Sequence, residues 1–154
     1  MLNHKMRPPK VLIVEDNALV AISLREVLNL LGLEVVGVAA SVNDALCLAQ
    51  NLRPDLAIFD VQLTGRRDGI EGAALLRDMV DIPVVFLTAQ GDKETQARAQ
   101  GVNPASFLYK PVSSQQIVAA GCAADERRRH IAALQRKRVS TQNQARQLSS
   151  GQSI

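Results

Sequence analysis

Residues 11–17 read Val-Leu-Ile-Val-Glu-Asp-Asn, a fully apolar run that ends in two acidic residues and an amide. Three of its four apolar residues are β-branched, which is typical of a strand buried on both faces of a parallel sheet. Residues 56–60, Leu-Ala-Ile-Phe-Asp, repeat this arrangement, and residues 84–88, Val-Val-Phe-Leu-Thr, repeat it with a hydroxyl in place of the acid. These stretches predict buried strands, each followed directly by a polar side chain.

Amphipathic segments separate the apolar runs along the first 124 residues. We expect strands at residues 11–14, 33–39, 56–59, 84–87 and 105–109, and helices at residues 19–31, 42–52, 70–80, 92–100 and from 113 or 114 through 122. In the first helix, the stripe expected to face the core comprises Leu19, Ile22, Leu24, Val27, Leu28 and Leu31. Strands that alternate with helices predict an α/β fold with a parallel sheet and helices on both faces.

Composition limits the classes of protein that this chain can represent. With 154 residues and 47% apolar content it is long enough for one packed domain and a short remainder. Aromatic residues make up 3%, too few for the stacking platforms of proteins that bind single-stranded nucleic acid. Cys47 and Cys122 are too few for a zinc cage, and each is expected to be buried as a small apolar residue. No apolar run reaches about 18 residues, so we expect a cytoplasmic protein without a membrane segment.

The charge is distributed unevenly along the chain. Residues 1–124 carry a net charge of −2 (11 basic, 13 acidic), whereas residues 125–154 carry +5 (seven basic, two acidic). Residues 125–139 can continue the last helix, and the Ser/Gln-rich residues 142–154 are expected to be disordered. The chain is therefore expected to be a mildly acidic domain with a basic C-terminal extension.

Polar residues follow four of the five predicted strands. In a parallel α/β sheet, ligands collect beyond the carboxyl ends of the strands. This rule places Glu15, Asp16, Asp60, Thr88 and Lys110 at one edge. Several carboxylates held close together repel one another, and Mg²⁺ prefers such oxygen ligands. We therefore expect a magnesium site at this edge.

The sequence resembles the receiver domain of two-component response regulators, in particular the chemotaxis-receiver-like, single-domain members. The resemblance covers about residues 9–124 and rests on residues 11–17, Asp60 after its apolar strand, Asp68-Gly69, Leu87-Thr88-Ala89 and Lys110-Pro111. It implies a flavodoxin-like, doubly wound five-stranded sheet of strand order 2-1-3-4-5. The implied organisation is an N-terminal extension (residues 1–8), a receiver domain (9–124) and a basic helical extension with a disordered tail (125–154).

The resemblance also implies roles for the acidic residues. Asp60 is expected to be the phosphoacceptor, a carboxylate nucleophile that attacks the phosphoryl group of a phosphohistidine. Asp16 is expected to bind Mg²⁺ directly and Glu15 to hold a coordinated water. Asp60 itself and the backbone carbonyl of Gln62 are expected to complete the protein ligands.

Three further residues receive roles from the resemblance. Lys110 is expected to bridge to Asp60 and then to the phosphoryl oxygens, and a cis peptide at Lys110-Pro111 is expected to aim its ammonium inward. Thr88 is expected to donate its hydroxyl to the phosphoryl group. Phe107 matches the aromatic switch residue that moves inward on phosphorylation, although a lone phenylalanine in a strand is more often an ordinary core residue.

The loop after Asp60 departs from the family pattern. Thr64 stands where a proline is usual, and the loop is one residue longer. Arg66 and Arg67 could attract an anionic partner or be a solvated pair. Gln62 and Gln90 occupy positions that tune the access of hydrolytic water, and two neutral amides there do not predict the lifetime of the phosphoryl group.

The expected function is a phosphorylation switch rather than an enzyme, although the chain assists its own phosphorylation and dephosphorylation. Its expected partners are a sensor histidine kinase or histidine phosphotransferase and a downstream protein that binds the face of the fourth helix, fifth strand and last helix. An alternative is a phospho-regulated nucleic-acid binder that uses the basic segment 127–138, which is less favoured because no aromatic residues interleave. A homodimer through Ile131 and Leu134 is a third hypothesis. A phosphatase is disfavoured because Gln62 stands where such enzymes place a second aspartate.

Overall fold

Five strands alternate with five helices in the residues that the computed structural model describes, which are 7–63, 68–89, 93–110 and 112–151. The strands are β1 (Lys10–Val14), β2 (Glu34–Ala39), β3 (Leu56–Asp60), β4 (Val84–Thr88) and β5 (Ser106–Tyr109). The helices are α1 (Ala18–Leu30), α2 (Val42–Leu52), α3 (Gly69–Val80), α4 (Lys93–Gly101) and α5 (Ser114–Ser150). The structure divides into two units, residues 1–124 and 125–154.

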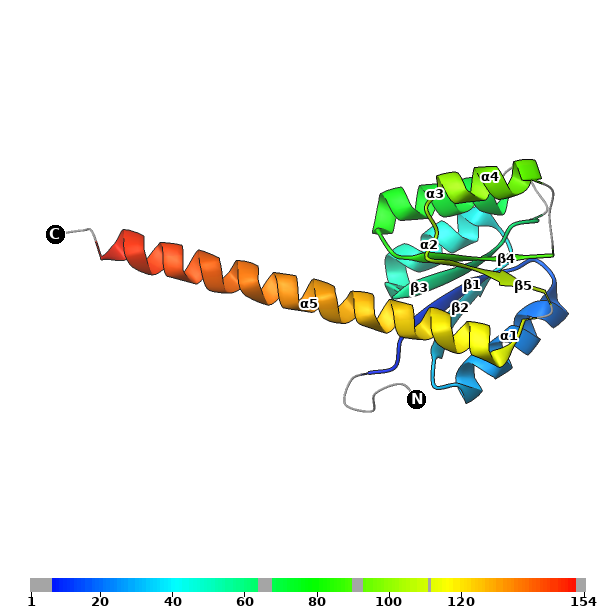
Figure 1. The fold of residues 1–154 in the computed structure, drawn as a ribbon, viewed down its shortest axis with the longest axis horizontal. Coiled ribbons are helices and arrows are strands. Elements are labelled where there is room, and N and C mark those ends of the chain that lie inside the picture. Colours follow the sequence, from blue (N-terminus) through cyan, green and yellow to red (C-terminus); the bar gives the residue numbers. More distant parts are fainter. Residues whose placement is uncertain (1–6, 64–67, 90–92, 111, 152–154) are drawn as a thin grey trace. The chain divides into compact units, whose positions relative to one another are not determined.

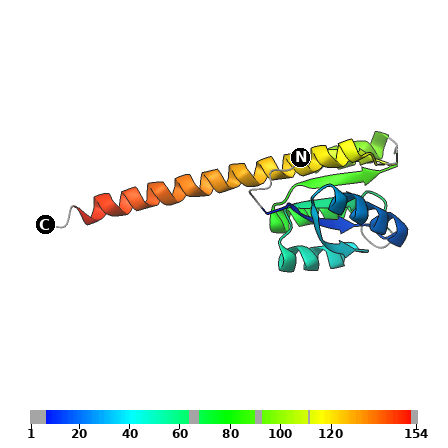
Figure 2. The same cartoon turned by 90° about the horizontal axis from the view of Figure 1, so that it is seen from below.

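All five strands belong to one parallel sheet of order β2-β1-β3-β4-β5, which confirms the predicted fold class. Within residues 1–124, α1 and the first turns of α5 cover one face of this sheet (Figure 1). Helices α2, α3 and α4 cover the other face (Figure 1). In the view from below, α1 and the first turns of α5 lie in front of the sheet (Figure 2). Residues predicted as separate strands and helices therefore form the expected three layers.

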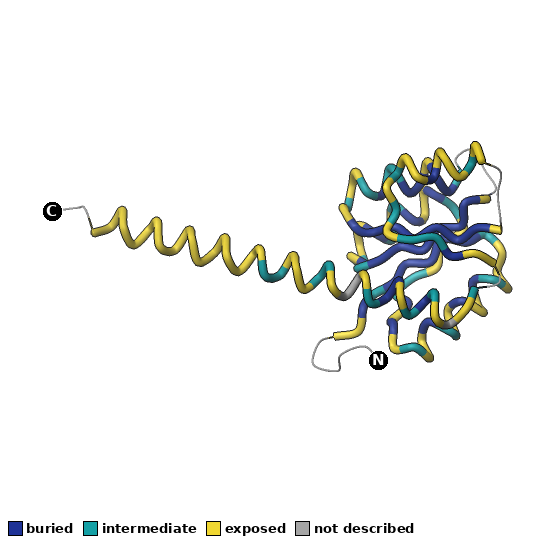
Figure 3. The backbone as a smooth tube through the Cα atoms, viewed as in Figure 1, coloured by how far each residue is buried: buried dark blue, intermediate teal, exposed yellow. Residues whose placement is uncertain are grey.

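The strands of the sheet supply two apolar cores, one on each face. Alternate residues of a strand point to opposite sides, so Leu12 and Val14 pack with α2 and α3, whereas Val11 and Ile13 pack with α1 and α5. Every residue of β3 and β4 is buried, and Figure 3 shows the strands as the most deeply buried part of this unit. Burial on both faces explains why these strands read as continuous apolar runs.

The predicted core stripe of α1 was wrong at its first two positions. Leu19 is 77% exposed and Ile22 is 54% exposed, whereas Ala21, Leu24 and Leu28 are buried. The side chain of Asn17 caps the helix by accepting hydrogen bonds from the N–H groups of its first turn, and the core-facing stripe that follows has Ala21 at its start. At about 100° per residue, Leu19 and Ile22 lie about 140° and 160° around the helix from Leu24, so they face solvent, whereas Val20 packs against the core.

The expectation that both cysteines are buried was also wrong. Cys47 is exposed and Cys122 is half-buried. In α2 the buried positions include Ala45 and Ala49, and Cys47, two residues from each, lies on the opposite face of the helix.

The predicted disorder from residue 142 differs from the structure, in which α5 continues to Ser150. Between Cys122 and Ser150 the chain has no proline or glycine and is rich in Ala, Arg, Gln and Leu, which favour a helix. The helix ends where Gly151 follows. Although α5 is long, neither it nor any other helix in the described residues is apolar enough to cross a membrane.

Helix α4 is held largely by polar contacts. Of its residues Ala99 alone is buried, and all of α4 lies within the described chain. Arg98 forms an ion pair with Asp68, the N-cap residue of α3, at 2.8 Å. Arg77 of α3 donates to the backbone carbonyls of Val102, at 2.7 Å, and Asn103. Two arginines therefore tie α3 to α4 and to the turn that follows it.

Gly69 opens α3 in direct contact with the end of β3. A Cβ atom at this position would lie 1.8 Å from the carbonyl oxygen of Asp60. Real Cβ atoms do not approach backbone oxygen this closely, so only glycine fits without displacing the strand end. Gly69 therefore helps to set the position of Asp60.

We predict that Gly69→Ala destabilises the chain by about 1–3 kcal/mol or more, because the strand end or the start of α3 must shift. The matched control is Gly101→Ala, where a Cβ atom has no neighbour within 4 Å and the change should be neutral or slightly stabilising. Urea unfolding followed by circular dichroism measures both. Equal stability of the two variants would contradict the assigned role of Gly69.

Candidate functional site

Three carboxylates meet at the carboxyl edge of the sheet, as predicted. Glu15 and Asp16 directly follow β1, and Asp60 is the last residue of the neighbouring strand β3. One carboxylate oxygen from each of the three lies within 4.8 Å of the others. Glu15 and Asp60 are buried and Asp16 is half-buried, so this acidic cluster is partly shielded from water.

Lys110 brings a positive charge to the acidic cluster. Its Nζ lies 3.5 Å from Asp60 Oδ2 and 4.0 Å from Glu15 Oε2. Its backbone N–H donates to the carbonyl of Thr88, which places the lysine beside the end of β4. The ammonium therefore bridges two of the three carboxylates.

Glu15 is the residue of the acidic cluster whose pKa is clearly shifted. Its side chain is buried, and Oε2 accepts no hydrogen bond from the described part of the chain. Burial, followed by the adjacent Asp60 carboxyl group, raises the pKa of Glu15 to about 7, although Lys110 acts in the opposite direction. One ammonium is therefore too little positive charge for this cluster.

A divalent cation fits this arrangement. The cluster offers only carboxylate oxygens, the ligand type that Mg²⁺ prefers, and one of these oxygens is buried without a hydrogen-bond donor. Glu15, Asp16 and Asp60 are the residues that could hold such an ion.

The carboxylate of Asp60 is oriented through both of its oxygens. Oδ1 accepts a hydrogen bond of 2.9 Å from the backbone N–H of Gln62, and Oδ2 faces Lys110. Gln62 itself is exposed, with its backbone held at the cluster by this contact. The arrangement suits a carboxylate that must be presented to another molecule in a fixed direction.

Thr88 and Phe107, the predicted switch pair, lie on adjacent strands. Thr88 is buried, and its hydroxyl donates to the carbonyl of Ala89 at 3.1 Å. Phe107 is half-buried and tilts against Phe86, with the ring centroids 5.8 Å apart. These contacts describe one arrangement of the pair, and the movement of Phe107 stays a prediction.

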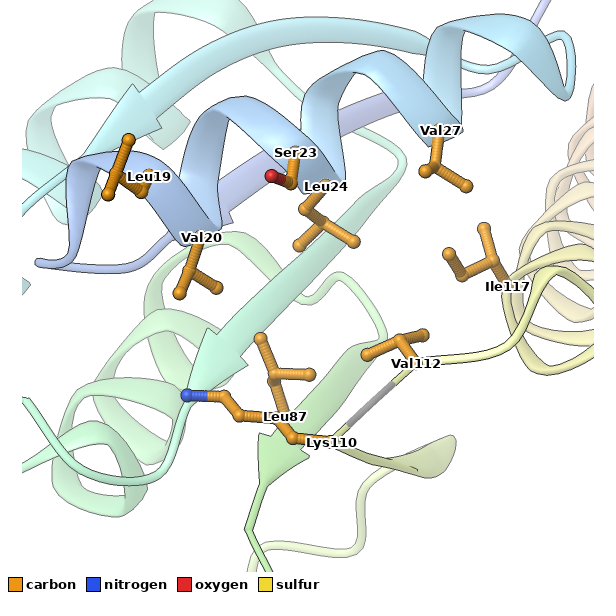
Figure 4. Close-up of a pocket in the computed structure, with 9 residues that line it drawn as sticks. All are labelled: Leu19, Val20, Ser23, Leu24, Val27, Leu87, Lys110, Val112 and Ile117. Carbon is orange, nitrogen blue, oxygen red and sulfur yellow. The ribbon is translucent and has the colours of Figure 1, made fainter.

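A groove of about 370 Å³ opens between α1 and the start of α5 (Figure 4). Apolar side chains from both helices face it, with Leu87 below and the Lys110 side chain along one side. Together with the exposed Leu19 and Ile22, it forms an apolar surface beside the acidic cluster. This surface was not predicted, because Leu19 and Ile22 were expected in the core. Their angles around the helix, about 140° and 160° from Leu24, are the signal that could have revealed it.

Five features predicted from the sequence lie outside the described residues. They are Thr64, Arg66, Arg67, Gln90 and the peptide bond between Lys110 and Pro111.

Comparison with known proteins gives a consistent family. The model of the response regulator receiver domain matches residues 11–121. The chain is 38% identical over 128 residues to the transcriptional regulatory protein PdtaR of Mycobacterium tuberculosis, covering 83% of this chain and 62% of that protein. It is 34% identical over 113 residues to the response regulator GacA of Pseudomonas aeruginosa, covering 72% of this chain and 52% of that protein. The chain thus matches less than two thirds of the length of these relatives.

Solved structures agree with this result. The signal receiver domain of a modulated diguanylate cyclase from Desulfovibrio desulfuricans is 40% identical, with a TM-score of 0.71, and the match covers 78% of this chain and 98% of that one. The chemotaxis protein CheY4 from Vibrio cholerae is 27% identical, with a TM-score of 0.65 and coverage of 73% and 94%.

We predict that, without divalent cations, wild type loses stability relative to Glu15→Gln as the pH rises from about 5 to about 8. The pKa of Glu15 is higher in the folded chain than the ordinary value near 4.3, so the folded state binds this proton more tightly and is disfavoured as the proton leaves. Urea unfolding in EDTA at several pH values measures the difference. Restoring millimolar Mg²⁺ should stabilise wild type more than the variant. A stability difference that does not change with pH would contradict the prediction.

Proposed function

Because the chain belongs to the response regulator receiver family of two-component signalling, we propose that it is a phosphorylation switch whose acceptor is Asp60. The observation that carries this proposal is that both oxygens of the Asp60 carboxylate are held in place. The backbone N–H of Gln62 donates to one oxygen, and Lys110 contacts the other. The proposed phosphodonor is a phosphohistidine of a sensor histidine kinase or phosphotransferase. Such kinases draw the phosphoryl group from ATP, so the compartment that we propose is the cytoplasm.

In the proposed step a carboxylate oxygen of Asp60 attacks the phosphorus of the phosphohistidine. The new O–P bond forms as the N–P bond breaks, and the electron pair of that bond returns to the imidazole nitrogen. Phosphoryl transfer of this kind requires alignment and charge neutralisation rather than further covalent help. The proposed product is an aspartyl phosphate on Asp60.

The residues around Asp60 fit the requirements of this transfer. Lys110 already faces Asp60 Oδ2 and is a compact charge that can follow the phosphoryl oxygens. Thr88 lies at the end of the neighbouring strand, where its hydroxyl can exchange the Ala89 carbonyl for a phosphoryl oxygen. When bound to Glu15, Asp16, Asp60 and the backbone carbonyl of Gln62, Mg²⁺ would neutralise the charge that the phosphoryl group brings. We propose that the chain assists its own modification in this way and acts on no separate substrate.

Phosphorylation adds about −1.5 to −2 charges at this edge. We propose that Thr88 moves toward the new charge and that Phe107 fills the space it leaves, shifting the population between two packings. The half-buried state of Phe107 supports this proposal, because a ring already at the core boundary can move inward without unfolding its strand. The surface affected comprises α4, β5 and the first turns of α5, where we propose that a downstream protein binds.

We predict that Asp60→Asn abolishes incorporation of phosphate from acetyl phosphate with Mg²⁺, because an amide is not a nucleophile for this transfer. The matched control, Asp78→Asn, removes an exposed carboxylate of α3 away from the acidic cluster and should be modified like wild type. Intact-mass spectrometry at neutral pH detects the added phosphoryl group. Phosphate incorporation by Asp60→Asn would refute the acceptor assignment.

The apolar surface of α1 supports a protein as the phosphodonor, in addition to small-molecule phosphodonors. Leu19 and Ile22 are exposed on the first turns of α1, immediately after the residues of the acidic cluster, and the groove between α1 and α5 continues this surface. A helical donor that presents its phosphohistidine to Asp60 would cover these side chains. We propose that this surface is where the donor docks.

We predict that the double substitution L19S/I22S slows phosphotransfer from the cognate kinase at least tenfold while leaving modification by acetyl phosphate unchanged. Met79→Ser, which alters an exposed apolar residue on α3, is the control and should affect neither reaction. Phosphotransfer is followed with radiolabelled kinase. If L19S/I22S slows both reactions equally, the effect is on the site itself and the docking assignment is wrong.

A further inference from the structure

The last twenty residues of α5, 131–150, carry an apolar stripe that lies outside the phosphoacceptor site. The stripe comprises Ile131, Leu134, Thr141, Ala145 and Leu148. At about 100° per residue, these five residues lie within an arc of about 100° around the helix. Their steps of three, seven, four and three residues follow the heptad spacing of helices that pack side by side. The end of α5 therefore presents a face that suits another helix.

The apolar stripe is exposed, as is most of this stretch of α5 (Figure 3). Ile131 is 36% exposed, Leu134 47% and Leu148 73%. The hydroxyl of Thr141 donates to the carbonyl of Lys137 at 2.9 Å, so its polar group is already satisfied within the helix. Val139 is exposed as well, but it lies about 130° from the centre of the stripe. The stripe is thus a set of side chains that share one direction.

Positive charge surrounds the apolar stripe. Residues 131–150 contain four basic residues and no acidic one. Lys137 and Arg146 lie on either side of the stripe, about 70° and 110° from its centre, and Arg136 lies opposite it. Arg138 lies within the arc of the stripe itself. Within the described residues none of these four forms an ion pair, so their charge is available to a partner.

Arg138 decides which kind of helix can cover the stripe. Its guanidinium would leave water when the stripe is covered, which is costly unless a carboxylate pairs with it. A second copy of α5 would bring another Arg138 to the middle of the same stripe, with no acidic residue in 131–150 to meet either of them. A homodimer through Ile131 and Leu134 is therefore disfavoured, whereas a helix that carries a carboxylate at this level removes the cost.

We propose that the apolar stripe of α5 binds an acidic amphipathic helix of another protein. Apolar side chains of that helix would cover Leu134 and Leu148, and a carboxylate near its middle would pair with Arg138, because a charged residue at one core position selects the partner. From Ile131 to Leu148 the stripe is about 26 Å long, at about 1.5 Å per residue, so it matches a partner helix of about three heptads. Nucleic acid would match the charge, but its phosphate backbone would leave the apolar side chains in water. The binding does not depend on the role of Asp60.

The test is fluorescence anisotropy of a labelled 21-residue peptide with the full chain in about 150 mM NaCl. This heptad peptide has leucine at the core positions of three heptads, except for one central glutamate, and glutamate at the flanking positions. A second peptide has the same composition in an order without heptad spacing. We expect the heptad peptide to bind at least tenfold more tightly, because its charge and its apolar residues share one face. Equal binding of the two peptides, or no binding of the heptad peptide, would overturn the proposal.

Two pairs of matched variants test the direction of contact. R138Q and R136Q each remove one positive charge, but position 136 lies opposite the stripe, so we expect R138Q to weaken binding at least tenfold and R136Q less than about threefold. L134A and V139A each shorten one exposed apolar side chain, and we expect L134A to weaken binding about tenfold and V139A to leave it unchanged. Circular dichroism checks that the helix is retained, since alanine and glutamine favour it. Equal losses within either pair would contradict the proposed contact.

Two other occupants of the stripe would give different results, and we expect neither. In sedimentation velocity, a dimer of the full chain that L134A dissolves would show that a second copy covers the stripe, and the proposal would be wrong. It would also be wrong if the full chain bound a 20-base-pair DNA duplex more tightly than the heptad peptide at the same salt concentration.

Discussion

Burial of the central strands on both faces is the constraint from which the site of this protein follows. A strand with apolar cores above and below it can place polar groups only at its ends, and in a parallel sheet the carboxyl ends share one edge. β1, β3 and β4 obey this rule: β1 is apolar from Val11 to Val14 with Lys10 at its start, and β3 and β4 are apolar until their last residues, Asp60 and Thr88. The position of the acidic cluster is therefore a consequence of how the sheet is covered.

The same burial makes the cluster electrostatically incomplete. At an effective dielectric constant of about 20, two unit charges about 4 Å apart interact by about 4 kcal/mol. Three carboxylates at such distances make three repulsive pairs, and the single ammonium of Lys110 lies 3.5 Å from Asp60 and 4.0 Å from Glu15. The raised pKa of Glu15 is the visible result, with burial as its largest cause. A site built this way gains stability from any cation that its geometry accepts.

The strand order and the meeting of the three carboxylates were predicted correctly from the sequence, whereas the exposed side of α1 and the end of α5 were not. Apolar runs and the polar residues that end them are local signals, so the strand order and the meeting of Glu15, Asp16 and Asp60 followed from them and from the family resemblance. Leu19 and Ile22 were misplaced because they were added to the core stripe on sequence spacing alone. At about 100° per residue they lie about 140° and 160° around the helix from Leu24, on the side away from the buried residues Ala21, Leu24 and Leu28. The end of α5 was misplaced because polar composition was taken as disorder, although its residues favour a helix.

The attachment of α4 has a consequence for how this protein can move. Apolar burial holds a helix through many contacts that are lost together, but α4 buries only Ala99 and relies on the arginines at positions 77 and 98. The exposed ion pair of Arg98 with Asp68 contributes little to stability, and the hydrogen bonds of Arg77 hold the turn after α4 rather than the helix itself. Helix α4 can therefore change its position while the sheet and the helices on its other face stay intact. Because salt screens an exposed ion pair, higher ionic strength is expected to loosen the contact of α4 with Asp68.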